Sequence, residues 1–279
     1  MEYGFINVHK PSGVSSAFVV SRVRHLTGLS CGHLGTLDPL ASGVLPVALG
    51  RATRLFNYML EKKKRYEAVF RFGVRSDTLD STGEVEVTGG KVPTEEELCR
   101  AIPALSGEVD QMPPKYSAKR IGGRHGYELA RKGEEFELSP KRVTIDRIEL
   151  LGKVAPDSYS FRIDCGAGTY IRSIARDLAA ACGTDGIMTA LVRSQSGAFS
   201  IEDAVPLEEL TKENVEEYLV PTDDALDLPK IEIENEHIFF GLPQATDEAD
   251  GLYKIYRGGE LYGLVEVKNK TAKSGAKLC

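Results

Sequence analysis

The 279-residue sequence lacks tryptophan, has only five histidines and five cysteines, and has no apolar run near the roughly 20 residues that a membrane span requires. Residues 1–4 carry neither the basic nor the apolar segment of a secretion signal, so we expect a cytoplasmic protein without membrane segments. The cysteines are scattered and none has CxxC spacing. This excludes a local zinc motif and a disulfide framework and predicts reduced thiols.

Motifs for cofactor chemistry are also missing. The sequence has no Walker loop, no HExxH and no zinc-deaminase signature. We therefore expect no metal, no nucleotide and no redox cofactor.

Positive charge is scarce overall but concentrated in a few segments. The net charge of −6 hides a local +6 in residues 1–66, +5 in residues 112–132 and +4 in residues 251–279. Residues 200–250 carry −14 and account for the acidic total. Each cluster alone is typical of a solvated face, but together the basic segments permit a surface that binds phosphates.

Hydrophobic periodicity predicts a mixed α+β protein. One predicted helix begins at Ser15 or Ser16 and ends at Gly28. The other predicted helices span Thr53–Glu61, Thr94–Leu105 with a capping box, and Tyr170–Cys182. The predicted strands span Phe5–Val8, Val44–Leu49, Tyr66–Phe72, Arg142–Leu151, Ser158–Cys165 and Phe199–Ile201. Residues 112–124 are predicted to be a loop followed by a short helix.

The acidic stretch Leu207–Asp227 marks a domain boundary. We expect residues 1–225 to form one domain and residues 226–279 a small β-rich module. Its strands are predicted at Lys230–Ile233, Ile238–Phe240, Leu252–Tyr256 and Leu261–Val267, before a low-complexity Lys/Ala/Gly tail.

The densest motif is GHLGTLDPLASGVLP, residues 32–46, in which three glycines and two prolines constrain one backbone path. Asp38 precedes Pro39, and an Asp-Pro pair alone indicates only a turn. Four apolar neighbours change that interpretation: Leu37, Leu40, Val44 and Leu45. They would partly desolvate the carboxylate, as suits a nucleophile.

A buried carboxylate needs a cation to stay ionised. Arg172 lies near the start of a predicted helix with an apolar face, although an arginine there is also typical of a surface. Tyr66 follows the basic run Lys62–Arg65. It is either a core residue or an aromatic ring at the mouth of a basic groove, where base stacking contributes about 1–3 kcal/mol.

Five motifs in this order resemble those of the bacterial TruB family, the tRNA pseudouridine-55 synthases. They are Gly4–Ser16 (GFINVHKPSGVSS), His33–Leu49 with its LDPLASG core, Arg65–Gly73 (RYEAVFRFG), Gly168–Leu178 (GTYIRSIARDL) and Leu191–Phe199 (LVRSQSGAF). The resemblance covers roughly residues 4–204. It implies an α+β catalytic domain around an antiparallel sheet and a small PUA-like RNA-binding domain at the C-terminus. The C-terminal module is shorter than most PUA domains, so its contact with the acceptor stem stays open.

The resemblance also implies the site. Asp38 would be the catalytic carboxylate. Tyr66 would stack on the target uracil and take the C5 proton, and Arg172 would pair with Asp38. Tyr170 would line the same pocket, and Leu191 would pack against the base.

Two further residues are implied by the same motifs. His33 would fill the space that the flipped nucleotide vacates in the T loop of tRNA. Lys10 would support the active-site loop and touch phosphate. The partner implied is the T stem-loop of tRNA, and we expect the protein to be a monomer that uses no cofactor.

Other functions remain compatible with the residues alone. In a non-catalytic RNA-binding or tRNA-folding module, Asp38 would be a turn former. In an RNA N-glycosidase, Asp38 would act with Asp77 or Asp80 and release free uracil. Whether Asp38 attacks C1′ or removes a sugar proton is also open.

Overall fold

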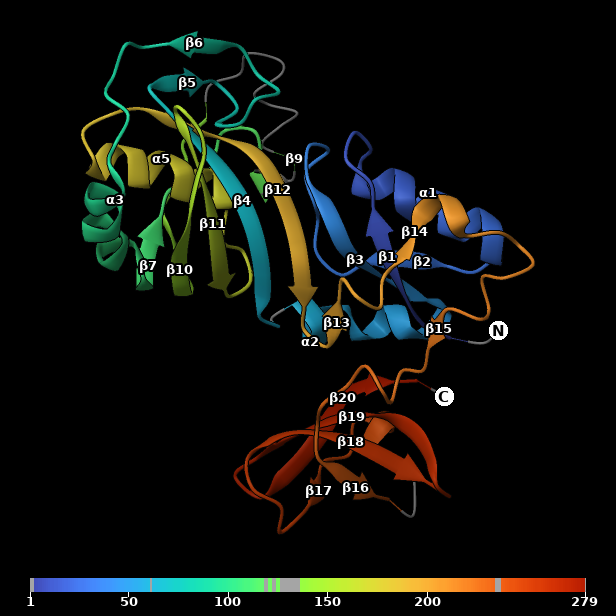
Figure 1. Cartoon of the computed structure of the whole chain (residues 1–279). Coiled ribbons are helices and arrows are strands. Elements are labelled where there is room, and N and C mark those ends of the chain that lie inside the picture. Colours follow the sequence, from blue (N-terminus) through green and yellow to red (C-terminus); the bar gives the residue numbers. More distant parts are fainter. Residues whose placement is uncertain are drawn as a thin grey trace.

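The computed structural model describes residues 3–60, 62–117, 120–121, 124–125, 136–233 and 237–278. Its larger part is an 11-stranded sheet made of β1 (Gly4–Lys10), β2 (Cys31–His33), β3 (Ser42–Leu49), β4 (Lys64–Phe72), β7 (Gly107–Gln111), β10 (Lys141–Ala155), β11 (Ser158–Cys165), β12 (Gly186–Ser196), β13 (Phe199–Ser200), β14 (Val205–Pro206) and β15 (Leu219–Val220). The main path runs β14-β1-β3-β12-β4-β11-β10-β7. Figure 1 shows two halves, one around β4 and β11 and the other around β1 and β3.

Strand β12 joins these two halves. It pairs antiparallel with β4 on one side and parallel with β3 on the other. Most other neighbours are antiparallel, with β1 and β14 a second parallel pair. The expected α+β class is therefore confirmed, with a sheet that is mixed rather than purely antiparallel.

The described α-helices are α1 (Ser16–Thr27), α2 (Phe56–Leu60), α3 (Glu95–Ala101) and α5 (Ile171–Ala181). Helix α5 packs against β12 and β4, α3 packs against β10 and α5, and α1 lies over β2 and β3. Ile171, Ile174 and Leu178 recur at helical spacing and are buried in the main core, where they meet the inward residues of β4. Short pieces complete this part: β5 (Val74–Ser76), β6 (Val85–Val87), β8 (Arg120–Ile121), β9 (Arg124–His125) and the 3-10 helices η1 (Gly50–Leu55), η2 (Ile102–Leu105) and η3 (Leu207–Glu209).

Local signals predicted most helix ends correctly. Ser15 caps α1 by accepting the Phe18 N–H, and Gly28 ends it in the left-handed conformation at φ 69°. The capping box at Thr94 is present, although its helix becomes 3-10 after Ala101. The helix expected over residues 53–61 is split between η1 and α2. The short helix expected after residue 124 lies outside the described residues.

A separate five-stranded sheet forms the C-terminal module, residues 230–277. Its strands are β16 (Lys230–Glu232), β17 (Gln244–Ala245), β18 (Gly251–Arg257), β19 (Glu260–Lys268) and β20 (Thr271–Lys277), in the order β16-β18-β19-β20-β17. The strand predicted at residues 238–240 is wrong, because these residues belong to the 3-10 helix η4 (His237–Phe240). A three-residue apolar run does not distinguish the two conformations. The predicted low-complexity tail is strand β20.

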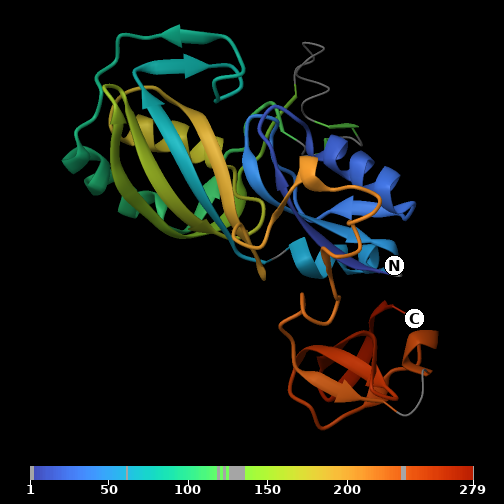
Figure 2. The same ribbon diagram turned by 45° about the vertical axis from the view of Figure 1, so that its right-hand side comes forward.

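The module sits below the β1 half of the large sheet in both ribbon views (Figures 1 and 2). Leu264, Ala276 and Leu278 share one apolar cluster with Phe5 and Leu55 of the first part. The C-terminal backbone is also held by two arginines. Arg51 donates to the Leu278 carbonyl at 3.1 Å and Arg54 to the Lys277 carbonyl at 2.8 Å.

Candidate active site

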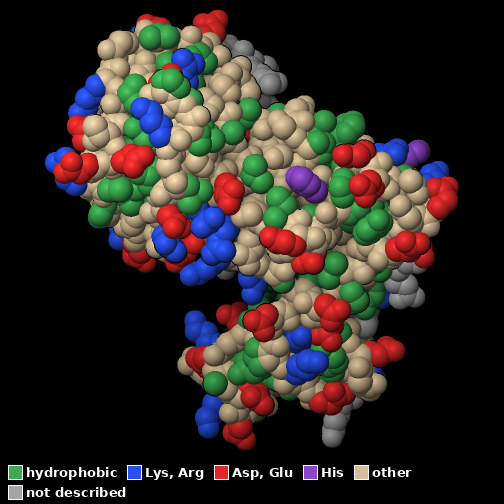
Figure 3. Space-filling model, in the orientation of Figure 1, with side chains coloured by type: hydrophobic (Ala, Val, Ile, Leu, Met, Phe, Trp, Pro, Cys, Tyr) green, Lys and Arg blue, Asp and Glu red, His purple; other side chains and the backbone are tan. Residues whose placement is uncertain are grey.

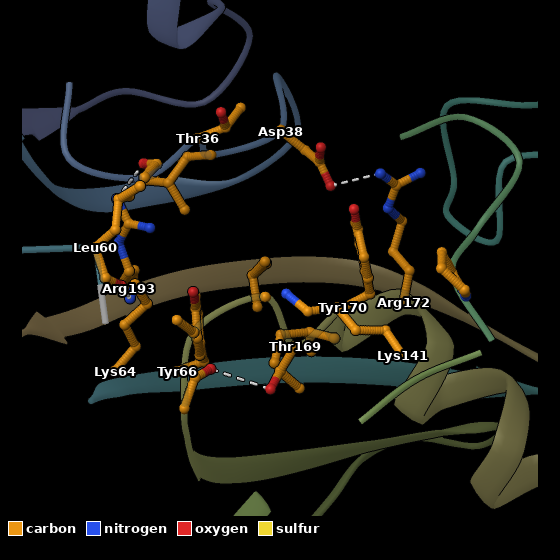
Figure 4. A pocket seen from close by; sticks show the side chains of 18 of the residues that line it. Thr36, Asp38, Leu60, Lys64, Tyr66, Lys141, Thr169, Tyr170, Arg172 and Arg193 are labelled. Atoms are coloured by element: carbon orange, nitrogen blue, oxygen red, sulfur yellow. Dashed lines mark hydrogen bonds and ion pairs between the residues drawn. The ribbon is translucent and has the colours of Figure 1, made fainter. Parts of the chain in front are cut away.

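A cavity of about 930 Å³ opens where the two halves of the large sheet meet. Its walls come from the loop before β3, from β4 and β12, and from the start of α5. Figure 4 shows Asp38 and Arg172 on one side, Arg193 and Lys64 on the other, and Tyr66 between them. Among the described lining residues, the charged ones are a single carboxylate, Asp38, and four cations: Lys64, Lys141, Arg172 and Arg193.

Asp38 and Arg172 form an ion pair with 2.9 Å between Oδ2 and Nη2. The Arg172 side chain is only 6% exposed. The same guanidinium donates to the carbonyls of Thr78 at 2.9 Å and Tyr116 at 3.0 Å, and it lies 3.4 Å from Asp80 Oδ2. Arg172 is therefore fixed from several sides and presents one edge to Asp38.

Burial raises the pKa of Asp38 above its ordinary value. The Arg172 guanidinium opposes this rise, the Asp80 carboxylate adds to it, and Lys10 opposes it from further away. The Asp38 side chain keeps 35% of its surface exposed, toward the cavity. The carboxylate is thus partly desolvated, paired and accessible, which are the properties of an activated nucleophile or base.

Lys10, the last residue of β1, holds together the turn that follows it and the loop that carries Asp38. Lys10 is fully buried, and its Nζ donates to the carbonyls of Pro11, Val14 and Pro39 at 2.9, 2.7 and 3.4 Å. Burial lowers its pKa to about 8. Lys10 therefore contacts the loop that carries Asp38 through the Pro39 carbonyl, and its ammonium lies away from the surface.

Tyr66 and Leu191 face the cavity from neighbouring strands. Both are 7% exposed, and β4 and β12 place Leu191 opposite Ala68 and Arg193 opposite Tyr66. Burial raises the pKa of the Tyr66 phenol, while the Arg193 guanidinium opposes the rise. A ring and a branched aliphatic side chain in one slot suit a planar heterocycle.

Tyr170 lines the cavity immediately before α5. Its backbone N–H donates to Gln111 Oε1 at 2.8 Å, and its carbonyl accepts from Gln111 Nε2 at 3.2 Å. Gln111, at the end of strand β7, therefore fixes the backbone at the start of α5. This also fixes the position of Arg172, two residues after Tyr170.

His33 lies apart from these residues. It sits on β2 opposite Val47 of β3 and is not one of the residues that line the cavity. Burial lowers its pKa, and its Nδ1 is buried without a partner among the described residues.

Sequence reasoning gave no individual role to four charged residues of this site: Asp80, Lys64, Arg193 and Lys141. Asp80 was considered only as part of a glycosidase, yet it lies on the far side of Arg172. Lys64 has the same strand parity as Tyr66, a signal that places both side chains on one face. Arg193 is in the LVRS motif, but it gave no local signal of burial.

Within the described residues, no group of three or more His, Cys, Asp or Glu side chains is placed to hold a metal ion. No helix in the same part of the chain has the length and apolar character to cross a bilayer.

Known proteins resemble this chain over nearly its whole length. The sequence profile of the TruB family pseudouridylate synthase N-terminal domain matches residues 24–171. A tRNA pseudouridine synthase B of Clostridium kluyveri is 40% identical over 271 residues, which are 93% of this chain and 93% of that protein. One of Gluconobacter oxydans is 34% identical and covers 99% of this chain and 90% of its own. A solved structure of a Cbf5–Nop10–Gar1 complex contains a chain with 27% identity and a TM-score of 0.72, covering 99% of this chain and 84% of that one.

Proposed function

The chain belongs to the TruB family of pseudouridylate synthases, and we propose that its cavity isomerises one uridine in the T loop of tRNA (position 55) to pseudouridine. Membership makes the protein a tRNA pseudouridine synthase, an isomerase. The observation that carries the proposed mechanism is the Asp38–Arg172 ion pair at the wall of a cavity that Tyr66 also lines.

Asp38 acts at the ribose. Whether it attacks C1′ or removes a sugar proton, it must be ionised, and Arg172 favours the ionised form. The N1–C1′ bond breaks, the uracil turns within the cavity, and a C5–C1′ bond forms. In the first route the Asp38 oxygen leaves C1′ as C5 attacks, and in the second Asp38 returns the sugar proton. The C5 proton then leaves, and N1 takes a proton from solvent. The RNA therefore loses one proton, gains one, and gains no other atom.

Tyr66 and Leu191 retain the ring during this exchange. The phenol ring stacks on the uracil, where an aromatic contact contributes about 1–3 kcal/mol, and Leu191 packs against it. We also assign Tyr66 to the removal of the C5 proton. Because burial raises its pKa, the phenol starts protonated, and it passes its own proton to solvent as it takes the C5 proton. Tyr170 closes the same pocket.

The remaining charges suit an RNA substrate. Among the lining residues that the structure describes, four cations outnumber one carboxylate, which attracts a polyanion although the whole chain is acidic. The target nucleotide must leave its stack to reach Asp38, which costs a few kcal/mol. We also assign His33, which does not line the cavity, to the T-loop space left by that nucleotide, as the family motif implies.

We further propose that residues 1–225 form the catalytic domain and residues 226–279 a PUA-like RNA-binding domain. The separate hydrogen bonding of the two sheets supports this division.

Substitution of Asp38→Asn tests the catalytic assignment, because it keeps the shape and removes the charge. With a tRNA transcript that carries 5-tritiated uridine, we expect tritium release to fall by at least about 10³-fold while tRNA affinity is retained. Asp157→Asn, which breaks the surface pair with Arg71, is the matched control and should leave the rate unchanged. Full activity of Asp38→Asn would show that Asp38 is not the catalytic carboxylate, and release of free uracil by the unsubstituted protein would indicate an N-glycosidase.

A further inference from the structure

Arg193 holds both ends of the loop that carries Asp38. Its Nη2 donates to the Gly35 carbonyl at 3.0 Å, and its Nε donates to the Val44 carbonyl at 2.8 Å. Asp38 lies in the chain between these two acceptors. One planar guanidinium therefore closes residues 35–44 into a ring with a fixed opening.

The strand that carries Arg193 also fixes its position relative to Tyr66. Arg193 on β12 is registered with Tyr66 on β4 and, on the other side, with Gly43 on β3. Gly43 has φ +101°, and an added Cβ would meet the Arg193 carbonyl oxygen. This close backbone approach leaves β12 and the loop little freedom to slide past each other.

Packing alone does not explain an arginine at this position. Arg193 is 1% exposed, and within the described part of the chain its guanidinium donates to backbone carbonyls and forms no ion pair with a carboxylate. A buried charge without a counter-ion is costly, and an apolar side chain of similar volume would fill the same space more favourably. The role of the guanidinium therefore lies in its hydrogen bonds to the Gly35 and Val44 carbonyls.

We propose that Arg193 is a positioning residue that sets the spacing between Asp38 and Tyr66. It clamps the loop of Asp38 to the strand beside Tyr66, and thus joins the reacting groups of the two halves of the sheet. The inference rests on the proposed function of Asp38 and Tyr66. A misplacement of about 1 Å between reacting groups costs on the order of 10²-fold in rate.

Arg193→Lys tests this proposal, because a lysine keeps the charge but lacks the planar fork. We expect the single-turnover rate at saturating tRNA to fall by on the order of 10²-fold, with the tRNA Kd within about twofold of the unsubstituted protein. Amide hydrogen exchange at Ala41, whose N–H donates to the Asp38 carbonyl, should accelerate at least about tenfold, while β11 stays protected. Arg71→Lys, on the strand of Tyr66 but in a surface ion pair, is the matched control and should change neither quantity.

Chemical rescue separates positioning from general stability. Methylguanidinium should restore part of the rate of Arg193→Ala, and methylammonium should not. Unchanged exchange at Ala41 in Arg193→Lys would overturn the clamp whatever the activity. A wild-type protein that releases no tritium would instead overturn the proposed function, and the exchange measurement would still decide the role of Arg193.

Discussion

Asp38 has charged neighbours with opposite effects on its ionisation. Burial is the largest effect and raises its pKa, Arg172 lowers it, and Asp80 raises it again. Because the net shift is upward, the ionised form is lost at a higher pH than for an ordinary aspartate. The rate should therefore decline on the acid side at a higher pH than the ionisation of an ordinary aspartate would give.

Asp80→Asn should move this acid limb to lower pH. Removing a negative neighbour favours ionised Asp38 and lowers its pKa, so activity persists further into acid. Single-turnover rates measured between about pH 4 and 8 would show the shift. Asp77→Asn, in the same segment, is the control. An acid limb that stays at the same pH or moves to higher pH would contradict the proposed effect of Asp80 on the ionisation of Asp38.

At the scale of elements, two adjacent serines at the start of α1 have different roles. Ser15 caps the helix through the Phe18 N–H. Ser16 points the other way, where its Oγ accepts the Leu37 N–H and donates to the Leu37 carbonyl, both at 2.9 Å. Helix α1 therefore holds the residue next to Asp38 as well as packing over the sheet.

Ser15→Ala and Ser16→Ala form a matched pair. Loss of the cap should cost about 1 kcal/mol, and loss of the buried Ser16 bonds about 1–3 kcal/mol, both measured by urea unfolding. Only Ser16→Ala should slow isomerisation, by about tenfold, because only it frees the backbone beside Asp38. Equal rates in the two variants would show that α1 does not position the loop.

At the scale of the whole molecule, the two sheets share an apolar seam. Leu278 is fully buried in the cluster that also contains Phe5 and Leu55 from the first part. Basic side chains gather at another place on the molecule. On the face in Figure 3, Lys and Arg side chains gather at the lower edge of the left half, beside the gap that separates it from the module.

Leu278→Ala should lower the free energy of unfolding by about 2–5 kcal/mol, because it opens a cavity in this seam. Leu242→Ala, on the same module but 57% exposed, should stay within about 0.5 kcal/mol. Urea unfolding followed by circular dichroism measures both. Equal effects would mean that the seam contributes nothing to the stability of the chain.

The sequence by itself determined the features that depend on neighbours along the chain. Helical spacing of Ile171, Ile174 and Leu178 predicted α5, and alternation predicted β4, because these periods are set by backbone geometry. The Asp38 loop, Tyr66 and Arg172 were found in the same way, from short motifs with a local physical signature and from the family pattern.

Tertiary structure alone decided which of these segments meet. Strand β12 was not predicted, since its mixed sequence lacks a clear period, yet it occupies the centre of the sheet. Its central place brings Arg193 to Val44, which is 149 positions earlier in the chain. Asp80 likewise reaches Arg172 only through the fold. Contacts of such separation are set by strand register and burial of the whole core, which no local pattern encodes.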